Sequence, residues 1–212
     1  MTMWAGHEFV CGRTGSGKSV YAVKRGLAHA GPCLYIDPQE QDDLPARWPR
    51  TGSQNMISQI LSLARRGGVV YVPDRRLKEA QREIRGLIGC LFAGRPWSPP
   101  LLLIVDEAQV FAPEGGADSP LTWIALRGRR WGVQGLFVSQ RPAEVDKSVV
   151  TQCARHVVFQ TAFEGPYFQR YGLPADDIRS RLSPPTPDHS YVVWDGVALT
   201  GPFKEELKGE GG

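Results

Sequence analysis

The sequence has no long hydrophobic run and no secretory leader. Its longest uninterrupted apolar stretch runs from Leu101 to Val105. A membrane-crossing helix needs about 20 apolar residues, so a spanning helix is excluded. The first residues carry no basic segment followed by an apolar one, so no signal peptide is visible and a cytoplasmic location is expected.

Cysteine and histidine are also scarce. The four cysteines lie far apart in apolar surroundings: Cys11, Cys33, Cys90 and Cys153. This spacing is typical neither of a disulfide framework nor of a zinc site, and we expect reduced thiols in the core. The histidines show no metal-ligand spacing either, and none is assigned a role: His7, His29, His156 and His189.

Charge of one sign is not in strong excess. The chain has 212 residues, with 25 basic and 22 acidic side chains and a formal net charge of +3. The ordinary hydrophobic content of 42% excludes a disordered or fibrous protein.

The length fits one α/β domain. We expect residues 1–212 to form this domain, with a core over about 7–160, a C-terminal extension over 161–203 and a frayed tail over 204–212.

Apolar runs that favour strands alternate with segments of helical spacing. The expected strands cover residues 8–11, 32–37, 68–72, 101–105, 135–138 and 156–160. The expected helices cover about 18–29, 56–63, 77–92 and 121–131, with a loop over 38–55. This alternation predicts an α/β fold with a mainly parallel sheet between helices. Residues 190–199 instead predict a β-hairpin that turns at Asp195-Gly196.

A glycine-rich segment follows the first expected strand and precedes the first helix. It matches G-x-x-x-x-G-K-[ST] at every fixed position, and it consists of Gly12, Arg13, Thr14, Gly15, Ser16, Gly17, Lys18 and Ser19. Its N–H groups and the helix N-terminus are suited to phosphate. We expect Lys18 to reach the β- and γ-phosphates of ATP and Ser19 to help hold Mg²⁺. The strand-loop-helix context disfavours a chance match.

Polar residues end two further strands of the predicted sheet. Asp106 and Glu107 follow the apolar run 101–105, and Gln140 follows the strand over 135–138. We expect Asp106 to bind Mg²⁺, Glu107 to polarise the attacking water and Gln140 to sense the γ-phosphate or that water. The alternatives are that Asp106 or Glu107 caps the next helix and that Gln140 merely ends its strand.

A more specific resemblance lies in residues 127–142, RGRRWGVQGLFVSQRP. This stretch resembles the segment before the sensor glutamine in the FtsK–HerA superfamily of DNA-pumping ATPases. Residues 146–153 and Ile36-Asp37-Pro38 are similar to the same group, and the resemblance covers about residues 7–160. It implies a RecA-like P-loop NTPase core that assembles as a ring, usually a hexamer, around DNA.

The small size selects a subgroup of this superfamily, because the extra domains of larger members do not fit in 212 residues. The chain most resembles the genome-packaging ATPases of tailless icosahedral viruses with an internal membrane. The resemblance implies a Mg²⁺-dependent ATPase that pumps double-stranded DNA into a preformed capsid. The implied partners are the DNA backbone, further copies of the chain in a homohexamer, and a capsid or vertex protein. The implied location is the host cytoplasm or a virion vertex, without a membrane span.

Other functions remain open at this point. The zonula-occludens-toxin-like assembly ATPases of filamentous phages also carry an N-terminal phosphate loop and an Asp-Glu-Ala-Gln sequence like that of residues 106–109. A HerA-like cellular DNA translocase and a nucleotide-dependent switch that does not translocate are further alternatives.

Ring ATPases place an arginine of one subunit on the γ-phosphate of the next. Arg129 is the first candidate for this finger, followed by Arg127, Arg130 and Arg155, and solvated surface charges are an equally weighted alternative. A second basic cluster opens the helix expected over 77–92 and consists of Arg75, Arg76, Lys78, Arg82 and Arg85. We favour a solvated helix face there, with Arg75 pairing to Glu79, over a DNA contact.

Overall fold

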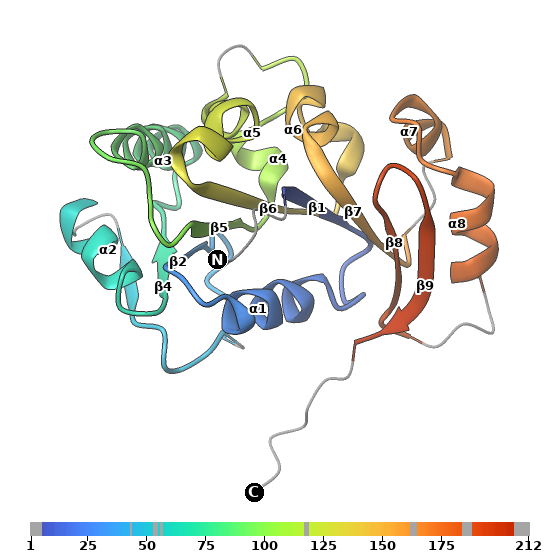
Figure 1. Cartoon of the computed structure of the whole chain (residues 1–212), viewed down its shortest axis with the longest axis horizontal. Helices are drawn as coiled ribbons and strands as arrows, with labels where there is room; N and C mark the ends of the chain where they lie inside the picture. The colour runs from blue at the N-terminus through green and yellow to red at the C-terminus, as the bar shows by residue number, and fades with distance from the viewer. Residues whose placement is uncertain are drawn as a thin grey trace, which may run out of the picture.

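A single twisted sheet organises the chain (Figure 1). The computed structural model describes residues 6–42, 44–52, 55, 57–116, 119–161, 165–183 and 188–205. The sheet has nine strands in the order β3-β4-β2-β5-β6-β1-β7-β8-β9. They are β1 (His7–Cys11), β2 (Cys33–Ile36), β3 (Arg50–Gly52), β4 (Val69–Val72), β5 (Leu101–Val105), β6 (Val133–Ser139), β7 (Cys153–Phe159), β8 (Ser190–Trp194) and β9 (Leu199–Lys204).

The sheet is parallel from β3 to β7, and only β8 and β9 pair in antiparallel fashion. Every residue of β1, β2, β5 and β6 is buried. Strands that are apolar on both faces need cover on both faces, and the flanking helices supply it. The prediction of a mainly parallel sheet between helices, with a C-terminal hairpin, is confirmed.

Two hydrophobic clusters fill the space between sheet and helices. Successive residues of a strand face opposite ways, so Phe9 and Val10 of β1 belong to different clusters. The helix α1 covers one face, and α2, α3, α5 and α6 cover the other (Figure 1). The helices are α1 (Lys18–Ala28), α2 (Ile57–Ala64), α3 (Leu77–Leu91), α4 (Ala108–Phe111), α5 (Pro120–Trp131), α6 (Lys147–Thr151), α7 (Gly165–Arg170) and α8 (Ala175–Leu182), and the 3₁₀ turn η1 spans Pro142–Glu144.

Several local predictions are wrong. The expected loop over 38–55 contains the edge strand β3, whose three residues are too few to show a periodicity. The short helices α4 and α6, and α7 and α8 in the C-terminal extension, were not predicted. The return strand of the hairpin begins at Leu199, because Val197 and Ala198 donate their N–H groups to the Asp195 carboxylate and form the turn.

The cysteine prediction holds for three thiols and is wrong for the fourth. Cys11, Cys33 and Cys153 are buried, whereas Cys90 is exposed on α3. The helical spacing of α3 places its buried residues Ile84, Leu87, Ile88 and Leu91 on the core face and Cys90 on the other. All four thiols are free. The expectations for Met56 at the start of the second helix and for the tail over 206–212 lie outside the described residues.

Two buried histidines make the stability of this fold depend on pH. Burial lowers the pKa of His7 and of His156 from 6.5 to about 4. The Nδ1 atom of His7 accepts a hydrogen bond from the Gly135 N–H over 2.8 Å, which requires a neutral ring. The unfolded chain binds a proton at each ring below about pH 6.5, while the folded chain does so only near pH 4.

Stability is therefore expected to fall as the pH is lowered from 6.5 toward 4, because the unfolded state binds more protons in this window. The urea midpoint of unfolding, measured at intervals between pH 7.5 and 4.5, checks this. His156→Gln should flatten the profile even if it lowers the stability at pH 7. The wild-type profile is the reference, because the half-buried His29 ring bonds the Pro100 carbonyl and His29→Gln is therefore not a neutral control. An unchanged slope in His156→Gln would contradict the assignment.

Candidate active site

The carboxyl ends of β1, β2, β5 and β6 meet at one edge of the sheet. The parallel register pairs Cys11 with Ser139 and Ile36 with Val105. The loop 12–19 leaves β1 at this edge, Asp106 and Glu107 leave β5, and Gln140 leaves β6. The fold thus brings together the residues predicted for nucleotide, metal and water, as expected for a parallel sheet.

The glycine-rich loop packs tightly against β7. A Cβ atom at Gly12 would lie 2.6 Å from the Phe159 Cβ and 2.8 Å from the Ser16 Oγ, so only glycine fits. The N–H of Arg13 donates to the Gln160 carbonyl over 2.9 Å. Gly17, with a φ of 102°, turns the chain into α1. The loop is therefore held by the sheet on one side and by the helix on the other.

Two side chains of the loop have donors that can bind an anion. The Ser16 hydroxyl is buried and has no hydrogen-bond partner within the described residues. Lys18 is 8% exposed, and its Nζ atom donates to the Arg13 carbonyl over 2.8 Å. Burial lowers the pKa of Lys18, although Asp106 and Glu107 act in the opposite direction. A phosphate group would satisfy both side chains, because it accepts hydrogen bonds and compensates the buried charge.

Asp106 is buried at the end of β5. Its Oδ2 atom accepts a hydrogen bond from the Tyr35 hydroxyl over 3.2 Å and another from the Gln41 amide. The Ser19 Oγ lies 3.5 Å from the same oxygen. One carboxylate and one hydroxyl, completed by phosphate and water, are a donor set that suits Mg²⁺. Within the described part of the chain, no group of three or more His, Cys, Asp and Glu side chains forms a metal cluster.

Glu107 has an unusual backbone conformation, with φ 49° and ψ 52°. Left-handed geometry costs a residue with a side chain about 1–3 kcal/mol and recurs at functional sites. Glu107 directly precedes α4, but its side chain makes no capping hydrogen bond, so the capping alternative does not hold for Glu107. Instead its Oε1 accepts from the Gln39 amide over 2.7 Å, and its Oε2 accepts from the Gln109 amide. Burial raises the pKa of Glu107, which makes the carboxylate a stronger base.

Gln140 lies beside the glycine-rich loop. The Thr14 hydroxyl donates to its Oε1 over 2.6 Å, so the amide is in contact with the proposed phosphate site. Next to it, the Ser139 hydroxyl donates to the Gln109 Oε1 over 2.7 Å. Gln109 therefore joins Glu107 to the end of β6, and this connection links the predicted base to the predicted sensor strand.

The sequence reasoning missed the amides that hold the two carboxylates in place. Gln39 and Gln41 follow β2, and their backbone N–H groups donate to the buried Asp37 carboxylate. Gln109 follows β5 by four residues. The available signal was positional: polar residues that lie just beyond a parallel strand reach the same edge as the glycine-rich loop.

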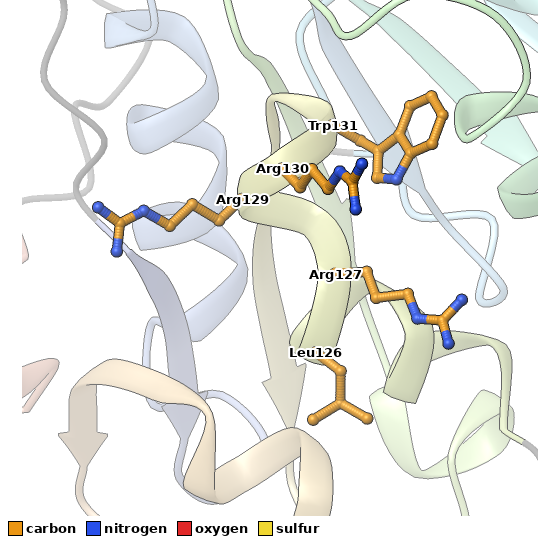
Figure 2. A pocket seen from close by; sticks show the side chains of 5 residues that line it. All are labelled: Leu126, Arg127, Arg129, Arg130 and Trp131. Carbon is orange, nitrogen blue, oxygen red and sulfur yellow. The ribbon is translucent and has the colours of Figure 1, made fainter.

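The predicted finger arginines lie at the other edge of the sheet. Arg127, Arg129 and Arg130 are exposed on α5, which ends where β6 begins. The seven residues of β6 span about 20 Å and separate them from Gln140. Figure 2 shows Arg129 extending to one side of α5 and Arg127 and Trp131 to the other. Arg155 forms an ion pair with the buried Glu8, with 3.5 Å between NH1 and Oε1, so it is engaged within its own chain.

Comparison with known proteins adds sequence relatives of two kinds. The sequence is 29% identical to Protein P9 of Pseudoalteromonas phage PM2 over 148 residues. This alignment covers 69% of this chain and 65% of the phage protein. It is 33% identical over 85 residues to the DNA double-strand break repair helicase HerA of Pyrococcus furiosus. The chain spans about two thirds of the phage protein, and only 15% of the helicase is matched. No family profile matches the chain.

The fold of the whole chain matches the genome-packaging NTPase B204 of Sulfolobus turreted icosahedral virus 2. The complex with AMP superposes with a TM-score of 0.69 and 16% identity, over 95% of this chain and 98% of B204. The complex with ATP-gammaS superposes with a TM-score of 0.66 and 17% identity, over 93% of this chain and 98% of B204. The chain thus has the fold of this packaging NTPase, and parts of its sequence are similar to a phage protein and to HerA helicases. Its described residues contain no helix that is long and apolar enough to cross a membrane.

Gln109 provides a test of the site geometry. Gln109→Leu should lower the turnover of ATP about 10-fold or more, because Glu107 loses the donor that fixes its carboxylate and a positioned base contributes about 10²–10⁴. Binding of a fluorescent ATP analogue should stay unchanged. Gln152→Leu, at an exposed position after α6, is the matched control. Equal turnover in the two variants would show that Gln109 does not position Glu107.

Proposed function

We propose that this chain is an ATP-hydrolysing translocase of double-stranded DNA that works as a viral genome-packaging motor and pumps DNA into a preformed capsid. The observation that carries the proposal is the convergence of the glycine-rich loop, Asp106, Glu107 and Gln140 at one sheet edge. The full-length likeness to B204 supports the packaging role over that of a larger helicase.

The residues of this edge divide the work of hydrolysis. The loop N–H groups, Ser16 and Lys18 bind and orient the phosphates. Ser19 and Asp106 hold Mg²⁺, which neutralises charge on the phosphate oxygens when it is bound. Glu107, kept in place by Gln39 and Gln109, accepts the proton of the attacking water. Gln140 contacts the γ-phosphate region from the end of β6.

The position of the α5 arginines supports a ring. They lie an entire strand length from the loop of their own chain, so Arg129, or else Arg127 or Arg130, acts on the nucleotide of an adjacent copy. We propose a homohexamer with DNA in its channel, which contacts the DNA through the backbone alone. A capsid or vertex protein is the further partner, and the motor works in the host cytoplasm and at the virion vertex.

DNA-stimulated ATPase activity is the test of this function. Double-stranded DNA should raise the turnover of the wild type at low salt. Glu107→Gln should bind ATP without cleaving it, since an amide cannot accept the proton, and Lys18→Ala should lose both steps. Glu144→Gln, an exposed carboxylate paired with Arg141, is the control and should keep full activity. An ATPase that no DNA stimulates would favour the assembly-factor or switch alternatives.

The arginine finger has its own test, by mixing of inactive variants. Glu107→Gln and Arg129→Ala should each be inactive alone, because an arginine finger contributes about 10³–10⁵ in rate. Mixed rings contain interfaces with an intact Glu107 on one side and an intact Arg129 on the other, so the mixture should regain part of the wild-type ATPase activity. If Arg129→Ala is inactive and no mixture recovers activity, Arg129 does not act between subunits.

A further inference from the structure

A basic cleft lies at the sheet edge opposite the nucleotide loop. Its volume is about 820 Å³, and it lies between the turn after α2 and the segment that joins α3 to β5. Three exposed arginines line it: Arg65, Arg66 and Arg95. We call this feature the arginine cleft. No aspartate or glutamate is among its lining residues.

The arginines of the cleft differ from most others in the chain in having no acidic partner. Within the described residues, none of the three forms an ion pair. At the nucleotide edge, by contrast, Arg75 pairs with Glu40 and Arg76 with Asp74. Arg76 also approaches Glu79, at 4.0 Å, so the predicted pair of Arg75 with Glu79 is wrong. Three unpaired guanidinium groups thus lie together on the side of the sheet away from the ATP site.

The shape of the cleft also suits a ligand with a chain of phosphate groups. The Arg65 guanidinium lies 4.4 Å from the centre of the Trp97 ring, and this stacking orients its donors. Gly67 and Gly94 line the same cleft, and nothing lies within 4 Å of the Cβ position of either. A polyanion can therefore approach the main chain at two turns without meeting a side chain.

The cleft continues toward the end of α5. The Trp97 N–H donates to the Trp131 carbonyl over 2.9 Å, and Trp131 lines the hollow that Arg129 and Arg130 also line (Figure 2). The arginine cleft is therefore joined to the end of α5, whose own arginines are assigned to the nucleotide of an adjacent copy and not to this ligand. A row of unpaired arginines suits the regularly spaced phosphates of a nucleic acid better than a single small anion.

We propose that the arginine cleft binds the phosphate backbone of double-stranded DNA. This proposal rests on the proposed translocase function and names the surface that the DNA contacts. Guanidinium groups without base-reading partners give contacts that ignore sequence, as a motor that must pass any sequence requires. The basic start of α3 is less suited to DNA, because two of its five basic residues, Arg75 and Arg76, are already paired with carboxylates.

Binding of a fluorescent 30-base-pair duplex to the full chain, followed by anisotropy, tests the site. Arg65→Ala/Arg95→Ala should weaken binding at least 10-fold at low salt. The double variant should also make the slope of log K against log salt concentration less steep by about two, because each lost phosphate contact lowers the magnitude of that slope by about 0.9. Arg75→Ala/Arg76→Ala removes the same charge from the other edge and should change affinity less than about 2-fold. ATPase activity without DNA should be unchanged in both variants, and melting curves verify their folding.

Cys90 supplies an independent readout, since it lines the cleft and is the exposed thiol among the four cysteines. Duplex DNA should slow its reaction with a maleimide.

If DNA stimulates the wild-type ATPase but Arg65→Ala/Arg95→Ala binds DNA normally, the cleft assignment is wrong and the translocase function stands. If the wild type binds no DNA, both the proposed translocase function and the assignment of the cleft are wrong. If Cys90 becomes protected with rising protein concentration in the absence of DNA, the cleft is a contact between copies and the proposal is overturned.

Discussion

The parallel pairing of β1 with β6, and of β5 with both β2 and β6, is the constraint on which the site depends. Each of these strands is short and entirely buried, so it has no freedom to slide without exposing apolar side chains or breaking its ladder. Their common direction sets the glycine-rich loop, both carboxylates and Gln140 at one edge. No single residue of the site contributes this arrangement. It follows from the hydrogen bonds between strands that are 30 to 130 residues apart in the sequence.

Much of this arrangement could be predicted because its signals are local. The apolar runs that become β1 and β5, and the fixed positions of the loop 12–19, are visible within a few residues of sequence, and the parallel sheet then implies where their ends meet. The amide side chains around the carboxylates gave only a positional signal, because they lie just beyond parallel strands. Which carboxylate each amide contacts does not follow from that position, and only the folded loop after β2 shows that Gln39 reaches Glu107.

Three features of the molecule differ from the sequence-based predictions for physical reasons. The edge strand β3 has three residues, and its pairing with β4 comes from the sheet already formed beside it. Cys90 was assigned to the core because its neighbours are apolar, but a helix of 3.6 residues per turn sends adjacent side chains in different directions. The predicted pair of Arg75 with Glu79 assumed that both lie on one helix, but α3 begins at Leu77 and Arg75 pairs with Glu40 instead.

Strand β6 connects two regions of the molecule that have different chemistry. At its carboxyl end lie Ser139 and Gln140, in hydrogen-bond contact with Gln109 and Thr14, and at its amino end lies the basic terminus of α5. The strand is buried throughout and hydrogen-bonded to neighbours on both sides, so its length fixes the spacing between these two regions. Evolution can lengthen the surface loops of such a protein freely, but adding or removing one residue in β6 would reverse the facing of every later side chain in the strand and change the spacing between the two ends at once.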